Sequence, residues 1–294
     1  MGWKTTKFLV IFLILAAVAF GFWHRDGIRD AAFAYRRVRL VASLPEALPY
    51  EKFLGNSGGD TAADVSPAQI FSEVSPAASP SEASPAESPE TSPQFQEYPD
   101  AQEAPALPEE INLAVPFTPQ APHANWELPY KEACEEASLL MVARYKNDAP
   151  IRSREDADEE IRALVAFQNG LFGDYKDTTA EQTAEIAREY YGFKNTEVVY
   201  DFTVEDVKRE VAVGNPVIIP AAGKILPNPY FRTPGPLYHM LVIRGYTKDR
   251  FITNDPGTKR GEEFTYTFDE LLNAAHDWNG GDVANGQRAM IVVR

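Results

Sequence analysis

The apolar positions of the chain from Ile111 onward have spacings that predict helices first and strands later. Apolar residues recur at helical spacing from Cys134 through Met141 to Tyr145, and the preceding Pro129 suits the entry to a helix. Further helices are predicted at 153–167, at 178–191, at 203–213 and from residue 267. Short apolar runs predict strands at 198–200, 216–220, 237–246, 251–254 and 289–293. Helices followed by an antiparallel sheet are typical of an α+β fold.

The runs at 237–246 and 251–254 are separated by a short polar stretch and predict a β-hairpin. His239 lies near the start of its first strand and Asp255 directly follows its second, so the two side chains are expected to meet. A carboxylate there could hold one tautomer of the imidazole while the other ring nitrogen faces a nucleophile. The alternative is a core histidine beside an aspartate that only closes an Asp-Pro-Gly turn. The proline-rich loop at 223–236 is expected to form one wall of a cleft.

Cys134 is the single cysteine among the 294 residues, and it lies where a loop turns into the first predicted helix. The unpaired N–H groups and positive dipole of a helix start favour a thiolate and can hold an oxyanion. One thiolate makes a poor zinc site, and a free cysteine can simply be a small core residue. The order Cys134, His239, Asp255 nevertheless predicts a nucleophile, a general base and an orienting carboxylate. His123 lies closer in sequence, but in a polar loop with nothing to fix its ring.

These motifs resemble those of the papain-like cysteine peptidases, in particular the bacterial double-glycine (bacteriocin-leader) peptidase-like group. The similar segments are 115–120, the cysteine at a helix start, 238–242 and 254–256. The resemblance implies a papain-like α+β fold and a thiol hydrolase that cleaves peptide or amide bonds through an acyl-enzyme at Cys134, without a metal or organic cofactor. It also implies that Gln120 donates its side-chain amide to the oxyanion, whereas a solvent-facing loop glutamine is the alternative.

Two glutamates follow the cysteine where the family commonly has Gly-Pro. Glu135 and Glu136 suit the helix dipole, but they place negative charge beside the thiolate and should raise the pKa of Cys134. Consecutive helical residues point about 100° apart, so we expect Glu135 to face solvent and Glu136 to face the cleft. This departure motivates an alternative function, a catalytically silent binding module on the same fold. The sequence does not separate a peptidase from an amidase or a transpeptidase.

The N-terminal part divides into two segments of contrasting composition. Residues 8–23 are uncharged and almost wholly apolar, slightly short of the roughly 20 residues that span a bilayer. This pattern predicts a membrane anchor or secretory signal at 1–42, and hence a membrane-anchored extracytoplasmic or secreted protein. Residues 43–110 carry six Ser-Pro pairs and 13 acidic residues against the single Lys52, which predicts a disordered, extended linker.

The remaining residues, 111–294, are long enough for one substantial core and form the predicted catalytic domain. The whole chain has a formal net charge of −15, most of it in the linker, and the domain itself is acidic. This charge argues against nucleic acid as a partner and leaves a peptide or protein substrate, with the membrane contacted through the N-terminal segment. The sequence contains no Gly-rich phosphate-binding motif, so any transporter that works with the protein would be a separate chain.

Overall fold

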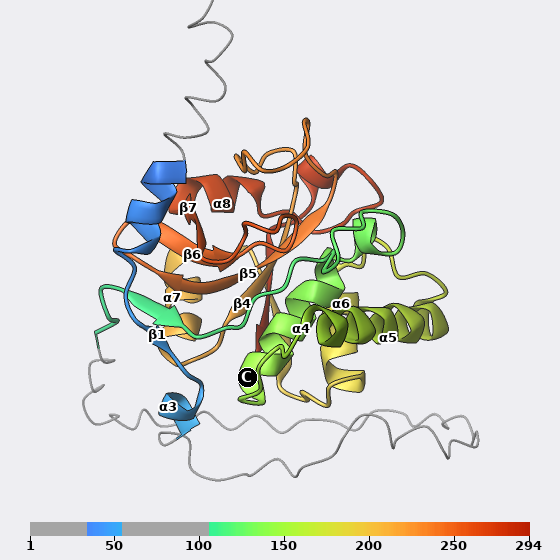
Figure 1. Cartoon of the computed structure of the whole chain (residues 1–294), viewed down its shortest axis with the longest axis horizontal. Coiled ribbons are helices and arrows are strands. Elements are labelled where there is room, and N and C mark those ends of the chain that lie inside the picture. Colours follow the sequence, from blue (N-terminus) through green and yellow to red (C-terminus); the bar gives the residue numbers. More distant parts are fainter. Residues whose placement is uncertain (1–33, 55–105) are drawn as a thin grey trace, which may run out of the picture. The chain divides into compact units, whose positions relative to one another are not determined.

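The structure, a computed structural model, describes residues 34–54 and 106–294. The expected anchor at 8–23 and most of the expected linker, 55–105, lie outside the described residues. Among the residues that are described, no helix is long and apolar enough to cross a membrane. The chain divides into two units between Ala47 and Leu48. In the first unit residues 34–41 are helical, and the second unit carries the sheet and the helices described below (Figure 1).

The second unit is built on an antiparallel sheet with the strand order β2-β5-β4-β8-β3, in which β5 also pairs with β6, and β6 with β7. The strands are β2 (Ile111–Leu113), β3 (Thr196–Tyr200), β4 (Val217–Ala221), β5 (His239–Tyr246), β6 (Arg250–Asn254), β7 (Phe264–Thr267) and β8 (Ala289–Val293). The helices are α4 (Cys134–Lys146), α5 (Arg154–Phe172), α6 (Ala180–Glu189), α7 (Val204–Ala212) and α8 (Phe268–Ala274), with short 3₁₀ turns at η2 (Tyr130–Glu132) and η3 (Val283–Asn285). The predicted α+β fold, with the cysteine at a helix start and the histidine and aspartate on the sheet, is confirmed.

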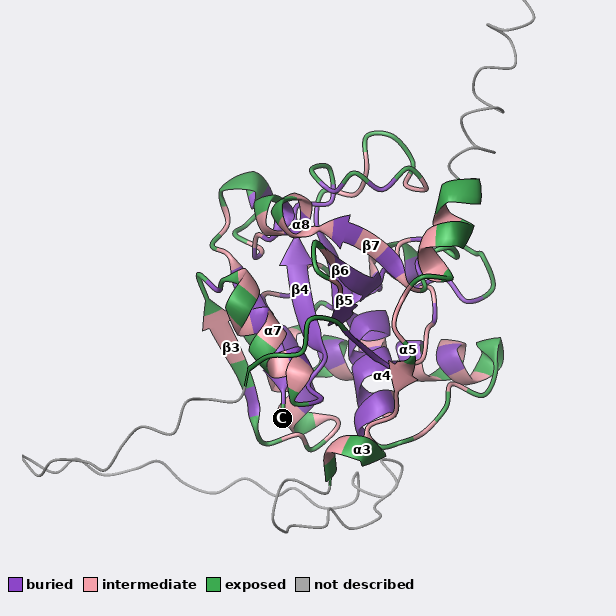
Figure 2. Cartoon of the chain, turned by 90° about the vertical axis from the view of Figure 1, so that its left-hand side faces the viewer, coloured by how far each residue is buried: buried purple, intermediate pink, exposed green. Residues whose placement is uncertain are grey.

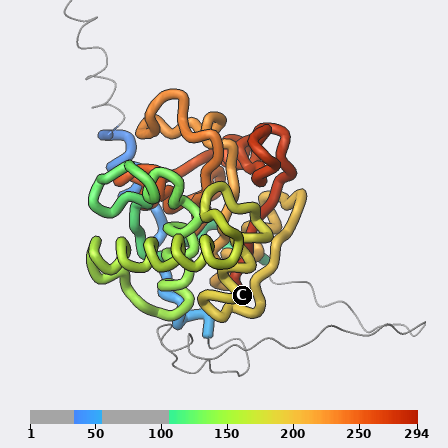
Figure 3. The backbone as a smooth tube through the Cα atoms, turned by 90° about the vertical axis from the view of Figure 1, so that its right-hand side faces the viewer, coloured from blue at the N-terminus to red at the C-terminus, as the bar shows by residue number. Residues whose placement is uncertain are grey.

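Strand β5 lies at the centre of the unit and is buried at every residue. It pairs with β2, β4 and β6 and packs against both α4 and α7. Helices α4, α5 and α6 lie together on one side of the unit (Figures 1 and 3), and the purple strands of Figure 2 show the burial. A strand covered in this way has no solvent face, which is why Met240–Ile243 form a continuous apolar run instead of an alternating one.

Side-chain caps fix the starts of four helices. The side chains of Ser153, Thr179, Thr203 and Thr267 each accept a hydrogen bond from the backbone N–H three residues later. The predicted helices at 153–167, at 178–191, at 203–213 and from 267 are therefore present. Helix α5 runs to Phe172, beyond its predicted end, and stops at Gly173, whose φ of 82° is accessible to glycine.

The expected linker at 43–110 differs from the structure at its N-terminal end. Ala47–Leu48 form strand β1 and Glu51–Leu54 form helix α3. Leu48, Tyr50 and Phe53 pack against the core, and Leu48 O accepts a hydrogen bond from Ala114 N at 2.7 Å. These three apolar side chains, inside an otherwise polar and acidic stretch, explain why the folded unit begins at Leu48 and not at Ile111.

Candidate active site

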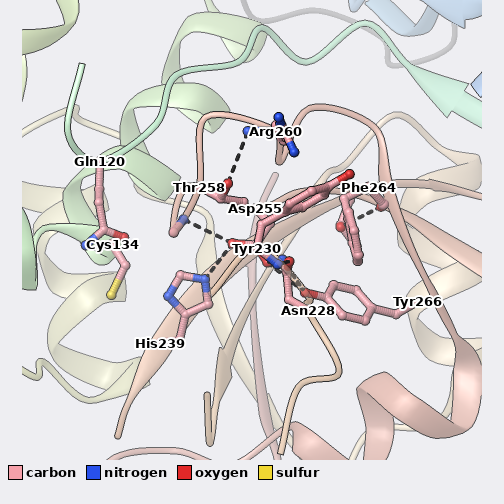
Figure 4. A network of polar contacts seen from close by, with 12 residues as sticks. Gln120, Cys134, Asn228, Tyr230, His239, Asp255, Thr258, Arg260, Phe264 and Tyr266 are labelled. Carbon is pink, nitrogen blue, oxygen red and sulfur yellow. Dashed lines mark hydrogen bonds and ion pairs between the residues drawn. The ribbon is translucent and has the colours of Figure 1, made fainter. Parts of the chain in front are cut away.

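A cavity of about 780 Å³ lies where the start of α4 meets the start of β5. Gln120, Cys134 and His239 line it, and Asp255 lies behind His239 (Figure 4). The loop segment 230–237 forms one wall, as predicted for the proline-rich loop before His239. His123, the alternative base, is exposed and does not line the cavity. The structure therefore brings the predicted residues together around one space.

Cys134 is the first residue of α4 and is 6% exposed. Its Sγ lies within hydrogen-bonding distance of Glu135 Oε2, at 3.0 Å. Burial raises the pKa of the thiol well above its usual value, and Glu135 adds to this rise when it is ionised. A hydrogen bond from the Met240 backbone acts in the opposite direction. Since Met240 follows His239 directly in β5, this contact places the sulfur beside the strand that carries the histidine.

Glu135 and Glu136 are both completely buried, so the expectation that Glu135 faces solvent and Glu136 faces the cleft is wrong. Glu135 Oε1 accepts a hydrogen bond from Thr178 N at 3.2 Å. Glu136 Oε1 accepts one from Gln168 Nε2, on α5, at 2.6 Å. The error arose because α4 is covered by α5, α6 and β5 and is buried at nearly every position, which leaves its first turn no solvent face.

His239 and Asp255 form the pair that the hairpin predicted. His239 Nε2 lies 2.8 Å from Asp255 Oδ1, and both side chains are buried. This leaves Nδ1 as the ring nitrogen available to a proton donor in the cavity, and Figure 4 shows the ring between Cys134 and Asp255. Phe231 packs edge-on against the imidazole, with the ring centroids 5.3 Å apart. This contact restricts rotation of the imidazole ring. The pairing of the two side chains is confirmed, while their catalytic roles stay a prediction.

Asp255 is held by more partners than the sequence indicated. Its Oδ2 accepts hydrogen bonds from Tyr266 OH at 2.7 Å and Asn228 Nδ2 at 2.9 Å, and its Oδ1 also accepts from Gly257 N at 3.0 Å. Burial alone would raise the pKa of Asp255. The charge of His239 and the hydrogen bonds from His239, Tyr266 and Asn228 outweigh burial and lower the pKa of Asp255 below its usual value. The carboxylate is therefore ionised and oriented before any substrate arrives.

The site also contains three residues that the sequence did not indicate, Asn228, Gly257 and Tyr266. The alternation Phe-Thr-Tyr-Thr at 264–267 is a strand signal that could have placed Tyr266 beside the hairpin. A Cβ at Gly257 would lie 2.9 Å from His239 Cε1, so only glycine fits there without a shift. Asn228 lies in an irregular loop, where no periodicity could have indicated it.

Gln120 joins two parts of the site. Its Nε2 donates to the backbone carbonyls of Tyr130 at 2.9 Å and Lys131 at 3.0 Å, which uses both amide hydrogens. Its backbone N–H donates to Pro256 O at 2.9 Å. The residue thus ties the turn after Asp255 to the turn that precedes Cys134. The oxyanion role of Gln120 stays a prediction, and the first-turn N–H groups of α4 are the other donors at this place.

Known proteins are similar to the part of the chain that contains this site. The sequence model of the Peptidase_C39-like family matches residues 112–280. A crystal structure described as a C39-like peptidase from Bacillus anthracis is 18% identical, with 64% of this chain and 98% of that chain covered and a TM-score of 0.43. A fragment of prointerpain A from Prevotella intermedia is 18% identical, with 47% and 42% covered and a TM-score of 0.32. No curated protein matches the chain.

Proposed function

Because the chain belongs to the Peptidase_C39-like family, we propose that this cysteine peptidase-type hydrolase cleaves peptide or amide bonds through an acyl-enzyme at Cys134. One observation carries the proposal. Cys134, at the start of a helix, lines the same cavity as His239, whose far nitrogen is hydrogen-bonded to the buried Asp255. A nucleophile, a base and a group that orients the base are the parts that covalent catalysis requires.

The reaction would use the free ring nitrogen of His239 twice. Nδ1 takes the proton of the Cys134 thiol, and the sulfur attacks the carbonyl carbon of the substrate. The negative charge that develops on the carbonyl oxygen is held by N–H groups of the first turn of α4. The protonated imidazole then gives its proton to the leaving amine as the C–N bond breaks. Water, deprotonated by the same nitrogen, hydrolyses the thioester and regenerates the thiol.

The substrate that this site supports is a peptide or protein. Trp126, Tyr230 and Phe231 line the cavity and offer apolar surface to side chains next to the bond that is cleaved. Amidase and transpeptidase reactions share the acyl-enzyme and differ in the acceptor, which is water for a hydrolase and an amine for a transpeptidase. Product analysis with and without an added amine acceptor would distinguish them.

A silent binding module is the second candidate, favoured by one observation. Burial and Glu135 raise the pKa of the Cys134 thiol, which opposes the thiolate that catalysis needs. A peptide electrophile offered to the native chain, to the denatured chain and to His239→Ala separates the two candidates. The enzyme labels faster when native and slows in His239→Ala, and it hydrolyses a fluorogenic peptide library that Cys134→Ala leaves intact. Native labelling no faster than denatured labelling, together with no peptide hydrolysis, would reject the enzyme.

We further propose that the enzyme is membrane-anchored with its catalytic unit outside the cytoplasm, or secreted. The support is the apolar run at 8–23, followed by the acidic stretch rich in Ser-Pro. Protease treatment of intact cells tests the location, and N-terminal sequencing of the mature protein tests whether the segment is cleaved. A catalytic unit that stays protected until the cells are lysed would contradict the proposal.

A further inference from the structure

The two carboxyl oxygens of Glu135 have different partners. Oε1 accepts the Thr178 N–H at 3.2 Å, and Oε2 lies 3.0 Å from the sulfur of Cys134. This second contact fits either of two arrangements. The thiol can donate to a carboxylate, or a carboxylic acid can donate its O–H to the sulfur. The charge around Glu135 decides between the two.

Burial outweighs the hydrogen bonds that favour a negative charge on Glu135, which come from Cys134, its own backbone and Thr178. Within the described part of the chain, no Lys, Arg or His forms an ion pair with it, and it is completely buried. A buried carboxylate without a cation is costly, so the group takes up a proton instead. The titratable groups that face it are Cys134 and Glu136 on its own helix, Tyr175 and Asp177 in the segment before α6, and Tyr238 next to β5.

The neighbouring acidic residues also raise the pKa of Glu135. Glu136 is also completely buried, and its Oε2 has no hydrogen-bond partner among the residues that the structure describes. Two adjacent buried carboxyl groups cannot both ionise without strong repulsion. Burial raises the pKa of Glu135 to about 8, and the charge of Asp177 contributes to this rise. At neutral pH Glu135 therefore carries a proton, and because Oε1 already accepts from Thr178, that proton lies on Oε2 and faces the sulfur.

We propose that Glu135 is a neutral acid that donates its O–H to the sulfur of Cys134 when the thiolate forms. This inference rests on the proposed function of Cys134 as the nucleophile. In the activation step the S–H bond breaks, its proton goes to Nδ1 of His239 and the electron pair stays on sulfur. The proton of Glu135 remains on Oε2 throughout. The thiolate then receives two hydrogen bonds, from Glu135 and from the backbone of Met240, neither of which brings negative charge.

Alkylation of the 294-residue chain with iodoacetamide tests the proposal, because Cys134 is the single cysteine of this sequence and the rate reports the thiolate directly. The variants are Glu135→Ala, which removes the donor, and Glu135→Gln, which keeps an N–H donor of similar size without a carboxyl. Glu136→Gln is the matched control, since Glu136 contacts Gln168 and not the sulfur. Rates are measured from pH 5 to pH 10, and circular dichroism verifies folding of each variant.

We expect Glu135→Ala to slow alkylation at pH 7 about tenfold and Glu135→Gln to stay within about threefold of the wild type. The wild-type profile should bend near pH 8, where Glu135 ionises, and the bend should be absent in Glu135→Gln. Infrared spectra of the wild type should show the carbonyl stretch of a protonated carboxyl that Glu135→Gln lacks, a reading that does not depend on the stability of Glu135→Ala.

Faster alkylation in either Glu135 variant would overturn the proposal, because Glu135 would then be a carboxylate that suppresses the thiolate. Unchanged rates in both variants, or equal slowing in both, would overturn it as well. The alkylation rate does not require substrate turnover. If the wild type alkylates as expected but hydrolyses no peptide, the proposed function fails while the role of Glu135 stands.

Discussion

Replacing Asp255 by Asn tests whether the buried carboxylate orients His239. Asn has almost the same shape as Asp but carries no charge and has a donor in place of one acceptor oxygen. If its carbonyl oxygen stays on the side of His239 and Gly257, its amide nitrogen faces Tyr266 and Asn228. The Tyr266 hydroxyl can rotate and accept, but the Asn228 amide then faces another donor. One buried donor without a partner costs about 1–3 kcal/mol of folding free energy.

The effect on activity follows from the hydrogen bond between His239 and Asp255. A hydrogen bond to a charged group contributes about 1.5–3 kcal/mol and a neutral one about 0.5–1.5 kcal/mol, so the conversion removes about 1–1.5 kcal/mol and should lower kcat/KM roughly five- to 13-fold. Hydrolysis of a fluorogenic peptide measures this change, and thermal unfolding measures stability. Asp249→Asn is the control, because Asp249 lies in the exposed turn of the same hairpin. A folded Asp255→Asn variant with kcat/KM within twofold of the wild type would refute the orienting role.

The stability difference should also depend on pH. Folding lowers the pKa of Asp255, so its ionised form stabilises the fold above the ordinary aspartate pKa of about 3.9. This contribution is lost as the pH falls through the lowered value. The wild type should therefore be more stable than Asp255→Asn at pH 7, and the difference should shrink below about pH 4. A difference that stays constant from pH 7 to pH 3 would show that folding does not lower the pKa of Asp255.

Three further changes probe other parts of the unit. In Gly257→Ala the new Cβ would lie 2.8 Å from Phe231 Cε1 and 2.9 Å from His239 Cε1, so we expect kcat/KM to fall at least tenfold and the free energy of unfolding to fall by about 1–3 kcal/mol. The control Gly170→Ala, which has open space around its Cβ, should keep both activity and stability. Gln120→Glu would set a carboxylate oxygen against two backbone carbonyls, and we expect a lower Tm together with lower kcat/KM, whereas a loss of kcat alone would indicate an oxyanion role. Burial lowers the pKa of Lys146 to about 8, so the unfolded chain binds more protons than the folded chain between pH 8 and 10.5. The stability of the wild type relative to Lys146→Met should therefore rise by roughly 3 kcal/mol at most over this range, and a stability difference that does not change with pH would contradict this.

The sequence predicted the parts of the fold in which one local pattern is enough. Thr179 and Thr203 each begin a helix because a polar side chain three residues later completes a capping box, and both residues can be read from the sequence. The hairpin of His239 and Asp255 follows from two short strands and a polar turn. Strand β7 was not predicted although Phe264 and Tyr266 alternate with threonines, because its four residues lie at the lower limit of a strand signal.

The orientation of Glu135 and Glu136 could not be predicted from helical periodicity. Periodicity identifies the buried face of a helix that has one exposed side, whereas α4 is covered by α5, α6 and β5. Neither acid has a nearby partner in sequence other than Cys134. Their partners Thr178 and Gln168 are 43 and 32 residues away, on elements whose packing the local sequence does not specify. Polar contacts of this kind become visible only with the tertiary structure.

Helix α4 separates the cavity from the place where the segment around Tyr50 is held. Cys134 is its first residue and Lys146 its last, so the two lie about 18 Å apart along the axis at 1.5 Å per residue. Lys146 Nζ donates to Tyr50 OH at 3.1 Å and lies 4.3 Å from the centroid of the Tyr50 ring. The segment that enters the expected linker is therefore held at the end of α4 remote from the nucleophile.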